Sequence, residues 1–358
     1  MRSKWITWVA VGMLVGLVAT LATGCAGSST APTTSSTAPS ATQPTKIKTA
    51  MVTDIGGLGD KSFNDLSAAG LDRAKADLGV DTKVLESKAP TDYESNLTQL
   101  SSAGYNPIFA VGFLMTDTVS KVSTVTPDVV FAGIDEFFDP TIPNVVGLNF
   151  KEQEAGYLAG IVAGSLTTMT KVDPRINSQP ILGFVGGMQI PPVQRYEVGF
   201  VAGAKKANPN VVVKKIYTGS FTDQQKGDEA AKALIGQGAD IVFAAAGQTG
   251  LGSAKACKDN KALFIGVDAD QFLTIPGIGD TIVTSAVKRV DNAVYDTVKK
   301  AADGTLKGGE NVEYGIKEDG VGLAPYHDWD SKLPASIKAA VETAKSDVVS
   351  GAFTVPAK

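Results

Sequence analysis

The sequence is almost devoid of histidine. Its single histidine, His327, lies in a late loop, and no serine or cysteine motif points to it. A Ser-His-Asp triad needs a histidine to carry the proton, and a histidine-based metal site needs several. We therefore expect neither kind of site and interpret His327 as a packed or surface residue.

The sequence also lacks an excess of positive charge. The formal net charge is -4, and loss of Arg2 and Lys4 with an N-terminal signal would take it to -6. A mildly acidic chain without a basic cluster is not built to bind nucleic acid. We expect no nucleic-acid partner.

A phosphate-binding loop is missing as well. The segment Gly56 to Ser62 superficially resembles one, but Asp60 stands where the glycine before the lysine should be. The spacing of the first glycine also fails, and a carboxylate at this position would repel phosphate. We therefore expect no nucleotide hydrolysis and, more broadly, no catalytic residues, cofactor or metal.

The first 25 residues predict a secretory lipoprotein signal. Arg2 and Lys4 precede an apolar run from Trp5 to Leu21, and the segment ends in Ala22-Thr23-Gly24-Cys25. This ending resembles a bacterial lipobox, although Ala22 stands where leucine is commonest. We expect Cys25 to be acylated, for example with palmitate, and to anchor the chain to the extracytoplasmic face of the cell membrane. The alternative is an uncleaved N-terminal anchor.

Residues 26–46 are almost entirely Ser, Thr, Ala, Pro and Gln. Such a segment has too little apolar surface to offset its ordering entropy, so it predicts a disordered tether. With Cys25 acylated, Cys257 is the only remaining cysteine, and no intrachain disulfide can form. We interpret Cys257 as a small helix residue and not as a nucleophile.

From Ile47 onward, short apolar β-rich runs alternate with helical patterns, which predicts right-handed βαβ units and an α/β fold. Most of the runs are continuously apolar, as expected for parallel strands covered on both faces. The predicted strands are Ile47–Val52, Thr82–Leu85, Pro107–Gly112, Val129–Ile134, Val145–Leu148, Ile181–Val185, Val211–Tyr217, Ile241–Ala245, Leu263–Val267 and Ile282–Val287.

The body holds about 310 residues, which is too many for one typical core and predicts two Rossmann-like lobes with parallel sheets joined by a hinge. A helical pattern rich in small residues, Glu152 to Leu166, separates the two strand series. We assign 47–150 and about 288–313 to lobe 1, and 151–287 and about 314–330 to lobe 2. Residues 331–358 form a C-terminal segment with a predicted helix over Leu333 to Val348.

The turn after the first predicted strand carries the most functional groups. It holds Asp54, the pair Gly56-Gly57, Phe63 and Asn64, and Ser62 suits the N-cap of the following helix. The turn lies at the carboxyl end of a strand, where open α/β sheets bind their ligands. The sequence therefore predicts a ligand site here.

Similar groups follow strands of both series, namely Asp135, Phe221, Gly247, Asp268 and Lys288. Each alone has a structural explanation as a cap, core residue or turn. Their joint placement at strand ends predicts one cleft between the lobes. Two aromatic faces could sandwich a ring, aspartate and asparagine could bind hydroxyl or N–H groups, and Lys288 could donate to a hydroxyl while balancing Asp268.

Longer motifs support a family assignment. They are Asp54-Ile-Gly-Gly with Asp60-Lys-Ser-Phe-Asn64, Val146-Gly-Leu-Asn-Phe150 with Glu154-Ala-Gly-Tyr157, Gly183-Phe-Val-Gly-Gly187 with Gly199-Phe-Val-Ala-Gly-Ala204, Gly219-Ser-Phe221, Gly238-Ala-Asp-Ile-Val-Phe243, Gly266-Val-Asp268 and Thr284-Ser-Ala-Val-Lys288. Over roughly Lys48 to Asp303, the chain resembles the basic membrane protein (BMP) family of bacterial lipoproteins, which includes purine nucleoside receptors.

The resemblance implies a type I periplasmic-binding-protein fold and substrate capture for an ABC importer, with a permease and an ATPase as partners. It implies that Phe63 and Phe221 stack on a base. Residues Asp54, Asn64 and Asp135 would meet the base edge, and Gly247, Asp268 and Lys288 would meet the ribose. This chain has Gln248-Thr249 after Gly247, where a second glycine is common in the family.

The function that follows is a lipid-anchored, monomeric receptor that closes on a nucleoside, with a purine nucleoside favoured. Segments near Phe150, Val287 and Tyr314 would act as hinges. The alternatives are a receptor of the same fold for a sugar or signalling ligand, a surface nucleoside hydrolase, and an adhesive or sensory lipoprotein.

Overall fold

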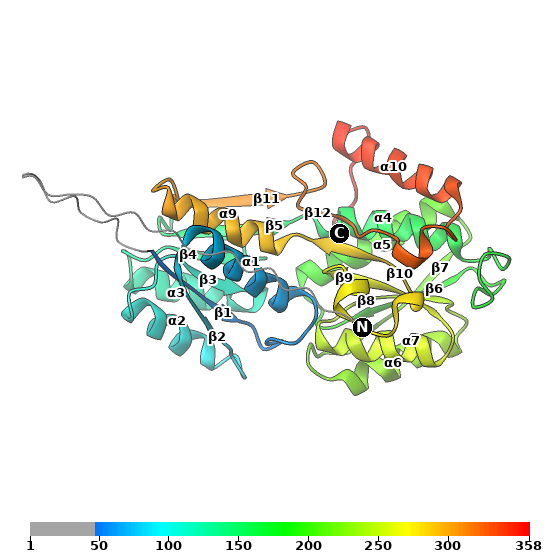
Figure 1. The fold of residues 1–358 in the computed structure, drawn as a ribbon, viewed down its shortest axis with the longest axis horizontal. Coiled ribbons are helices and arrows are strands. Elements are labelled where there is room, and N and C mark those ends of the chain that lie inside the picture. The colour runs from blue at the N-terminus through cyan, green and yellow to red at the C-terminus, as the bar shows by residue number, and fades with distance from the viewer. Residues whose placement is uncertain (1–46) are drawn as a thin grey trace, which may run out of the picture. The chain divides into compact units, whose positions relative to one another are not determined.

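The structure, a computed structural model, describes residues 47–358. The predicted signal, Cys25 and the tether lie outside these residues. Two six-stranded sheets organise the described part of the chain (Figure 1). No helix within residues 47–358 is both long enough and apolar enough to span a membrane.

The first sheet has the order β11-β5-β4-β3-β1-β2, and its neighbouring strands are parallel. Its four inner strands, β5, β4, β3 and β1, are almost entirely buried, as covering on both faces requires. The strands are β1 (Lys48–Thr53), β2 (Asp81–Leu85), β3 (Ile108–Val111), β4 (Phe131–Ile134), β5 (Val145–Phe150) and β11 (Glu310–Tyr314).

The second sheet has the order β12-β10-β9-β8-β6-β7, and only its edge strand β12 runs antiparallel to its neighbour. The strands are β6 (Ile181–Gly186), β7 (Val212–Tyr217), β8 (Ile241–Ala245), β9 (Leu263–Asp268), β10 (Ile282–Lys288) and β12 (Val321–Leu323). The predicted strands correspond to β1 through β10, with ends that differ by at most two residues. The short strands β11 and β12 were not predicted.

Helices cover both faces of each sheet, so the predicted α/β class with two lobes is confirmed. The helices are α1 (Phe63–Leu78), α2 (Asp92–Ser102), α3 (Thr116–Val125), α4 (Glu152–Leu166), α5 (Pro191–Ala207), α6 (Gln224–Gly236), α7 (Gln248–Asp259), α8 (Gln271–Thr274), α9 (Val290–Ala302) and α10 (Ala335–Ser350). Short 3-10 turns occupy Phe113–Met115, Gly279–Thr281 and His327–Trp329.

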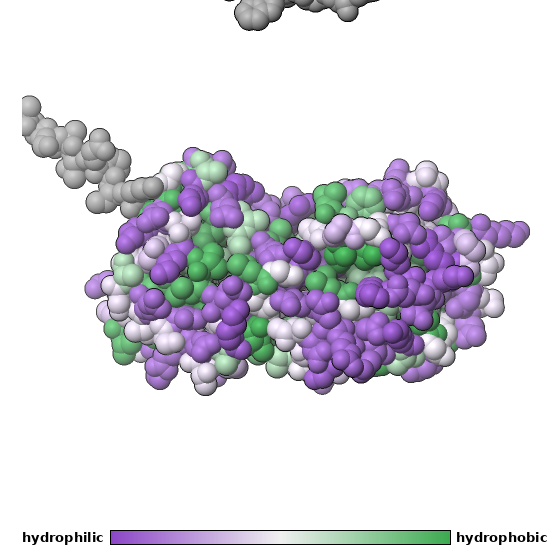
Figure 2. Space-filling view, turned by 60° about the horizontal axis from the view of Figure 1, so that its bottom comes forward, coloured by the Kyte–Doolittle hydropathy of each residue, from purple (hydrophilic) through white to green (hydrophobic). Residues whose placement is uncertain are grey.

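Helix α10 begins and ends two residues later than the predicted helix and packs against α4. Hydrophilic side chains gather on the outer face over α6 and α7 (Figure 2). This outer face is therefore exposed to solvent.

Glycines bring α4 and α5 together. The backbone of Gly160 lies so close to the carbonyl oxygen of Phe200 that a Cβ would collide with it, and a Cβ on Gly164 would collide with the carbonyl oxygen of Ala204. The small residues of the 152–166 pattern therefore serve close helix packing, as predicted, because a larger side chain would push the helices apart.

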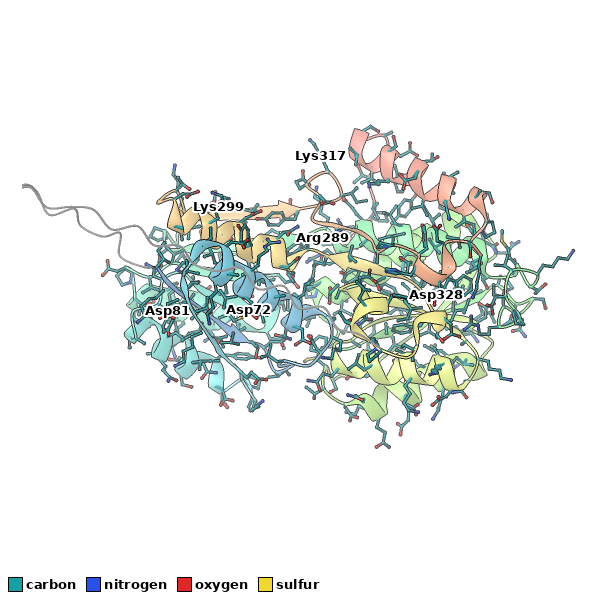
Figure 3. All side chains as sticks on the ribbon, in the orientation of Figure 1. Asp72, Asp81, Arg289, Lys299, Lys317 and Asp328 are labelled. Carbon is teal, nitrogen blue, oxygen red and sulfur yellow. The ribbon has the colours of Figure 1, made fainter. Side chains whose placement is uncertain are left out.

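The chain passes between the two sheets three times. It does so after Phe150 at the end of β5, after Lys288 at the end of β10, and after Tyr314 at the end of β11. Arg289 marks the second passage, where β10 leads into α9 (Figure 3). Two of the passages lie side by side, because the rings of Phe150 and Tyr314 stack with centroids 5.2 Å apart.

Candidate ligand-binding site

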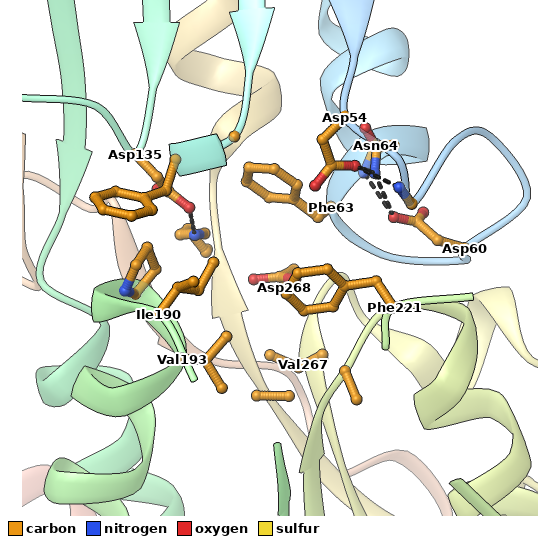
Figure 4. A pocket seen from close by; sticks show the side chains of 18 of the residues that line it. Asp54, Asp60, Phe63, Asn64, Asp135, Ile190, Val193, Phe221, Val267 and Asp268 are labelled. Atoms are coloured by element: carbon orange, nitrogen blue, oxygen red, sulfur yellow. Dashed lines mark hydrogen bonds and ion pairs between the residues drawn. The ribbon is translucent and has the colours of Figure 1, made fainter. Parts of the chain in front are cut away.

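A pocket lies between the carboxyl ends of the strands of both sheets (Figure 4). Every residue predicted to bind ligand lines it, namely Asp54, Phe63, Asn64, Asp135, Phe221, Gly247, Asp268 and Lys288. The geometry brings these residues together, whereas their contact with a ligand stays a prediction.

The first wall is the turn between β1 and α1. Asp54 Oδ1 accepts hydrogen bonds from the Gly56 amide at 2.8 Å and from Asn64 Nδ2 at 3.0 Å. Asn64 Nδ2 also donates to Asp60 Oδ2 at 3.2 Å. Because carboxylates only accept, the Asn64 amide nitrogen must face them. The buried Asn64 Oδ1 has no partner among residues 47–358 and remains an acceptor available to a ligand.

Asp60, and not Ser62, caps helix α1 with its side chain. The Asp60 carboxylate accepts the backbone N–H groups of Ser62, Asn64 and Asp65 at 3.0, 2.8 and 3.1 Å. Ser62 occupies the N-cap position, but its hydroxyl makes no capping bond. Ser62 therefore occupies the predicted N-cap position, but the prediction that its side chain caps the helix is wrong. The Asp60 carboxylate, two residues earlier, accepts from several free amides of the first turn at once.

Lys288 is almost fully buried and joins groups from distant parts of the chain. Its Nζ lies 2.6 Å from Asp135 Oδ2 and 3.2 Å from Glu152 Oε1. Glu152 Oε2 in turn accepts from Arg195 Nε at 2.5 Å. These four residues form a buried ion network between the loop after β4 and helices α4 and α5.

Lys288 balances the charge of Asp268 through space, as predicted, but the two side chains make no direct ion pair. Asp268 Oδ1 accepts instead from the hydroxyl of Tyr196 at 3.0 Å, while Lys288 bonds to Asp135 and Glu152. Tyr196 comes from α5, and no sequence pattern had marked it as a site residue. Lys288 and Asp268 still line the same pocket and interact through space.

Two pocket aspartates have left-handed backbone conformations. Asp135 follows β4 with φ of 65°, and Asp268 ends β9 with φ of 59°. Aspartate tolerates this region better than most residues, but it remains uncommon outside glycine. Each lobe therefore holds one pocket aspartate in the left-handed region. Backbone strain of this kind concentrates at functional sites.

Burial dominates the electrostatics of the pocket. It raises the pKa of Asp54 and of Asp268 to about 6, and it raises the pKa of Asp135 to about 7. Burial alone would lower the pKa of Lys288, but the carboxylates of Asp135, Glu152 and Asp268 raise it above its usual value. Lys288 therefore stays charged, while the aspartates titrate near neutral pH.

The pKa values predict that the ligand-free protein is more stable in mild acid. Asp54, Asp135 and Asp268 have folded-state pKa values above the unfolded value of 3.8, so the folded protein binds more protons between about pH 4 and 7. Their stabilisation is complete below pH 4 and is lost as the pH rises through 6 to 7. Together these three shifts should make the free energy of unfolding in urea about 5 kcal/mol higher at pH 5 than at pH 8.

The variant Asp54→Asn should show a smaller rise between these pH values. A matched control is Asp72→Asn, because Asp72 is exposed on α1 (Figure 3) and the variant should keep the full dependence. A wild-type stability that is flat or falls from pH 8 to pH 5 would contradict the prediction.

Aromatic and apolar groups complete the pocket. Phe63 and Phe221 come from opposite walls (Figure 4), and Lys288 Nζ lies 4.6 Å from the centroid of the Phe63 ring. Further lining residues were not predicted, and they are Gly56, Asp60, Gly112, Phe113, Ile190, Pro192, Val193, Tyr196, Ala245, Ala246 and Val267. Of these, Gly56, Asp60 and Val267 lay in recognised motifs, whereas apolar residues at helix starts give no such signal in the sequence.

The residues set aside in the sequence also lie away from the pocket. His327 stacks on Phe272 with centroids 4.1 Å apart and lies 2.7 Å from Asp270 Oδ2. Cys257 is buried within α7, and burial raises the pKa of its thiol. Neither residue lines the pocket.

Comparison with known proteins identifies the family of this chain. The family described as ABC transporter substrate-binding protein PnrA-like, Bmp, matches residues 47–350. The chain belongs to the Bmp family. Members bind substrates for ABC transporters, so the chain is a substrate-binding protein and not an enzyme.

Individual relatives agree with the family. The chain is 33% identical over 332 residues to the ABC transporter nucleoside-binding protein BmpA of Lactococcus lactis, covering 88% of this chain and 90% of BmpA. It is 38% identical over 329 residues to a lipoprotein of Pyrococcus horikoshii of uncharacterized function, covering 88% and 76%. The crystal structure of an ABC transporter solute-binding protein from Aeropyrum pernix K1 superposes with a TM-score of 0.79 at 30% identity, covering 87% and 94%.

Proposed function

We propose that this Bmp-family protein captures nucleosides, with purine nucleosides favoured, and delivers them to the permease and ATPase of an ABC importer. The observation that carries the proposal is the pair of rings, Phe63 and Phe221, on opposite walls of a pocket that also presents buried hydrogen-bonding groups. A flat base could stack between the two ring faces, while the polar side chains beside them bind its edge. The similarity to the nucleoside-binding protein of Lactococcus lactis supports the same ligand class.

The pocket residues divide into three roles in this proposal. Phe63 and Phe221 stack on the base, Asp54, Asn64 and Asp135 bind its edge, and Gly247, Asp268 and Lys288 bind the ribose. The unpartnered Asn64 Oδ1 and the pocket-lining Asp54 carboxylate are acceptors, so they favour a base edge that carries N–H groups. Inosine and guanosine have a ring N–H of this kind.

Closure and anchoring complete the proposal. The passages after Phe150, Lys288 and Tyr314 would absorb a hinge rotation that closes the lobes over the ligand. Cys25 would carry the lipid that holds the protein at the extracytoplasmic face of the membrane, in line with the similarity to a lipoprotein of Pyrococcus horikoshii. We infer a monomer, since a hinged receptor on a tether needs no second copy.

Calorimetry with inosine, guanosine, adenosine, cytidine and ribose tests the ligand class. We expect inosine and guanosine to bind with micromolar or tighter dissociation constants, adenosine and cytidine more weakly, and ribose weakest. If no nucleoside binds in this range, the proposal fails. Equal binding of ribose and nucleosides would identify a sugar receptor.

The variant Asn64→Ala tests the reading of the base edge. It should weaken inosine by about 1 to 3 kcal/mol, because a buried N–H of the base would lose its acceptor. Ribose binding should be unchanged, since ribose does not reach this edge. The control Asn210→Ala removes the same side chain from an exposed loop and should bind inosine like the wild type. If the affinities for ribose and inosine fell equally, Asn64 would contact the ribose and not the base edge.

A further inference from the structure

The turn that carries Asp54 and Asn64 has its amide donors satisfied within its own lobe. The amide of Leu58 donates to Glu86 Oε2 at 3.1 Å. The amides of Gly59 and Lys61 donate to the two carboxylate oxygens of Asp65 at 2.7 and 3.1 Å. These partners lie at the end of β2 and in α1, so they hold the turn whichever position the other lobe takes.

The carbonyl groups of the same turn are bound by the other lobe. Gln248 Nε2 donates to the Gly56 oxygen at 2.9 Å and to the Leu58 oxygen at 3.3 Å. Thr274 Oγ1 donates to the Lys61 oxygen at 2.9 Å. Gln248 begins α7 and Thr274 ends α8, and both helices belong to the second lobe.

The backbone conformation of Lys61 suits this contact. Its φ is 57°, in a region that residues other than glycine rarely occupy. Strained conformations persist where surrounding contacts hold them. Here the Asp65 carboxylate holds the amide of Lys61 from one lobe, and Thr274 holds its carbonyl from the other.

Gln248 is itself fixed beside the second aromatic wall. The Thr249 amide donates to the carbonyl oxygen of Phe221 at 3.2 Å, and Gly247 adopts a φ of 55° in contact with Phe221. The side chain of Gln248 therefore connects the segment that carries Phe221 to the turn that carries Asp54 and leads into Phe63. Neither Gln248 nor Thr274 lines the pocket.

We propose that Gln248 and Thr274 are positioning residues that latch the turn of the first lobe to the second lobe in the closed protein and thereby slow release of the ligand. This inference rests on the proposed function, in which closure retains a nucleoside. The latch acts only after the lobes have met, because its donors and acceptors belong to different lobes. It therefore affects dissociation and leaves ligand entry unchanged.

Stopped-flow kinetics with inosine test the latch. Gln248→Glu keeps the shape of the side chain but places a carboxylate against two carbonyl oxygens, so the dissociation rate should rise about 10-fold with an association rate within 2-fold of wild type. Thr274→Val removes one donor and should raise dissociation about 3-fold. Gln248→Lys can still donate to the carbonyls and should stay within 3-fold of wild type.

Gln237→Glu is the matched control, because it makes the same change at an exposed position just past the end of α6 and should leave both rates unchanged. Urea unfolding of each variant without ligand separates the latch from general destabilisation. Wild-type dissociation in both Gln248→Glu and Thr274→Val would overturn the proposal. So would a Gln248→Lys variant that releases inosine as fast as Gln248→Glu.

Small-angle X-ray scattering keeps this test separate from the ligand assignment. The mature protein is measured with and without saturating inosine, and the closed fraction should be smaller in Gln248→Glu than in wild type. If the wild-type protein fails to bind inosine, the proposed function fails. The latch is then tested by comparing the closed fractions of ligand-free wild type and ligand-free Gln248→Glu. Equal closed fractions in the two proteins, or no closed wild-type population in either sample, would overturn the latch.

Discussion

Replacing Lys288 by methionine is expected to destabilise the folded protein by about 3 to 5 kcal/mol, the usual cost of breaking a buried ion pair from one side. Methionine has a similar volume but cannot compensate the carboxylates of Asp135 and Glu152, which lie 2.6 and 3.2 Å from Lys288 Nζ. Glu152 keeps a second cation in direct contact, Arg195, which attracts Asp135 only through space. Urea unfolding of wild type and variant at pH 8 measures the loss.

The control for this prediction is Lys299→Met. Lys299 pairs with Asp303 at 2.7 Å, but both side chains are about half exposed, at 51% and 53%. Exposed pairs of this kind contribute about 0 to 1 kcal/mol, so the control should remain close to wild type. Adding Asp135→Asn to Lys288→Met should recover part of the loss, because it removes the unpaired charge. A Lys288→Met variant as stable as the control would contradict the buried network.

Replacing Phe63 or Phe221 by alanine is expected to weaken inosine binding by about 1 to 3 kcal/mol each, the range observed when aromatic stacking on a base is lost. This corresponds to a roughly 5- to 150-fold larger dissociation constant. Both rings are only partly buried without a ligand, so much of their burial would occur on binding. Calorimetry with inosine at fixed salt and pH gives the two losses.

Phe353→Ala is a control for the loss of an aromatic ring. Phe353 stacks on Tyr157 with centroids 5.0 Å apart and does not line the pocket, so its removal should leave inosine affinity unchanged. Phe63→Leu separates stacking from packing, since leucine keeps apolar contact beneath the ring of the base but offers no π face. Wild-type affinity in both alanine variants would reject the base sandwich. A loss in only one would mean that the base stacks on a single ring.

Much of the fold was readable from the sequence because its signals are local. Continuous apolar runs such as Ile241–Ala245 predict buried parallel strands wherever they occur, and this strand has the predicted bounds. Edge strands carry weaker signals. Strand β11 is Glu-Asn-Val-Glu-Tyr and β12 is only Val321–Leu323, so neither has the apolar run by which the other strands were found.

The candidate site was predictable where a functional group directly follows a strand. Asp54, Asp135, Asp268 and Lys288 all lie at strand ends, and the parallel arrangement brings such ends to the same edge of a sheet. Tyr196 lies within α5, five residues after the helix begins, and resembles any half-apolar helix residue. Its role became visible only when the fold placed its hydroxyl 3.0 Å from Asp268.

The sequence by itself determined the α/β class, the two series of strands, the family resemblance and those pocket residues that follow strands, because all of these depend on local patterns and short motifs. The tertiary structure decided which charges pair. Lys288 is 153 residues from Asp135 and 136 from Glu152, and it bonds to these instead of Asp268, which is much nearer in the chain. Charge pairing depends on distance and burial in space, and neither follows from separation along the sequence.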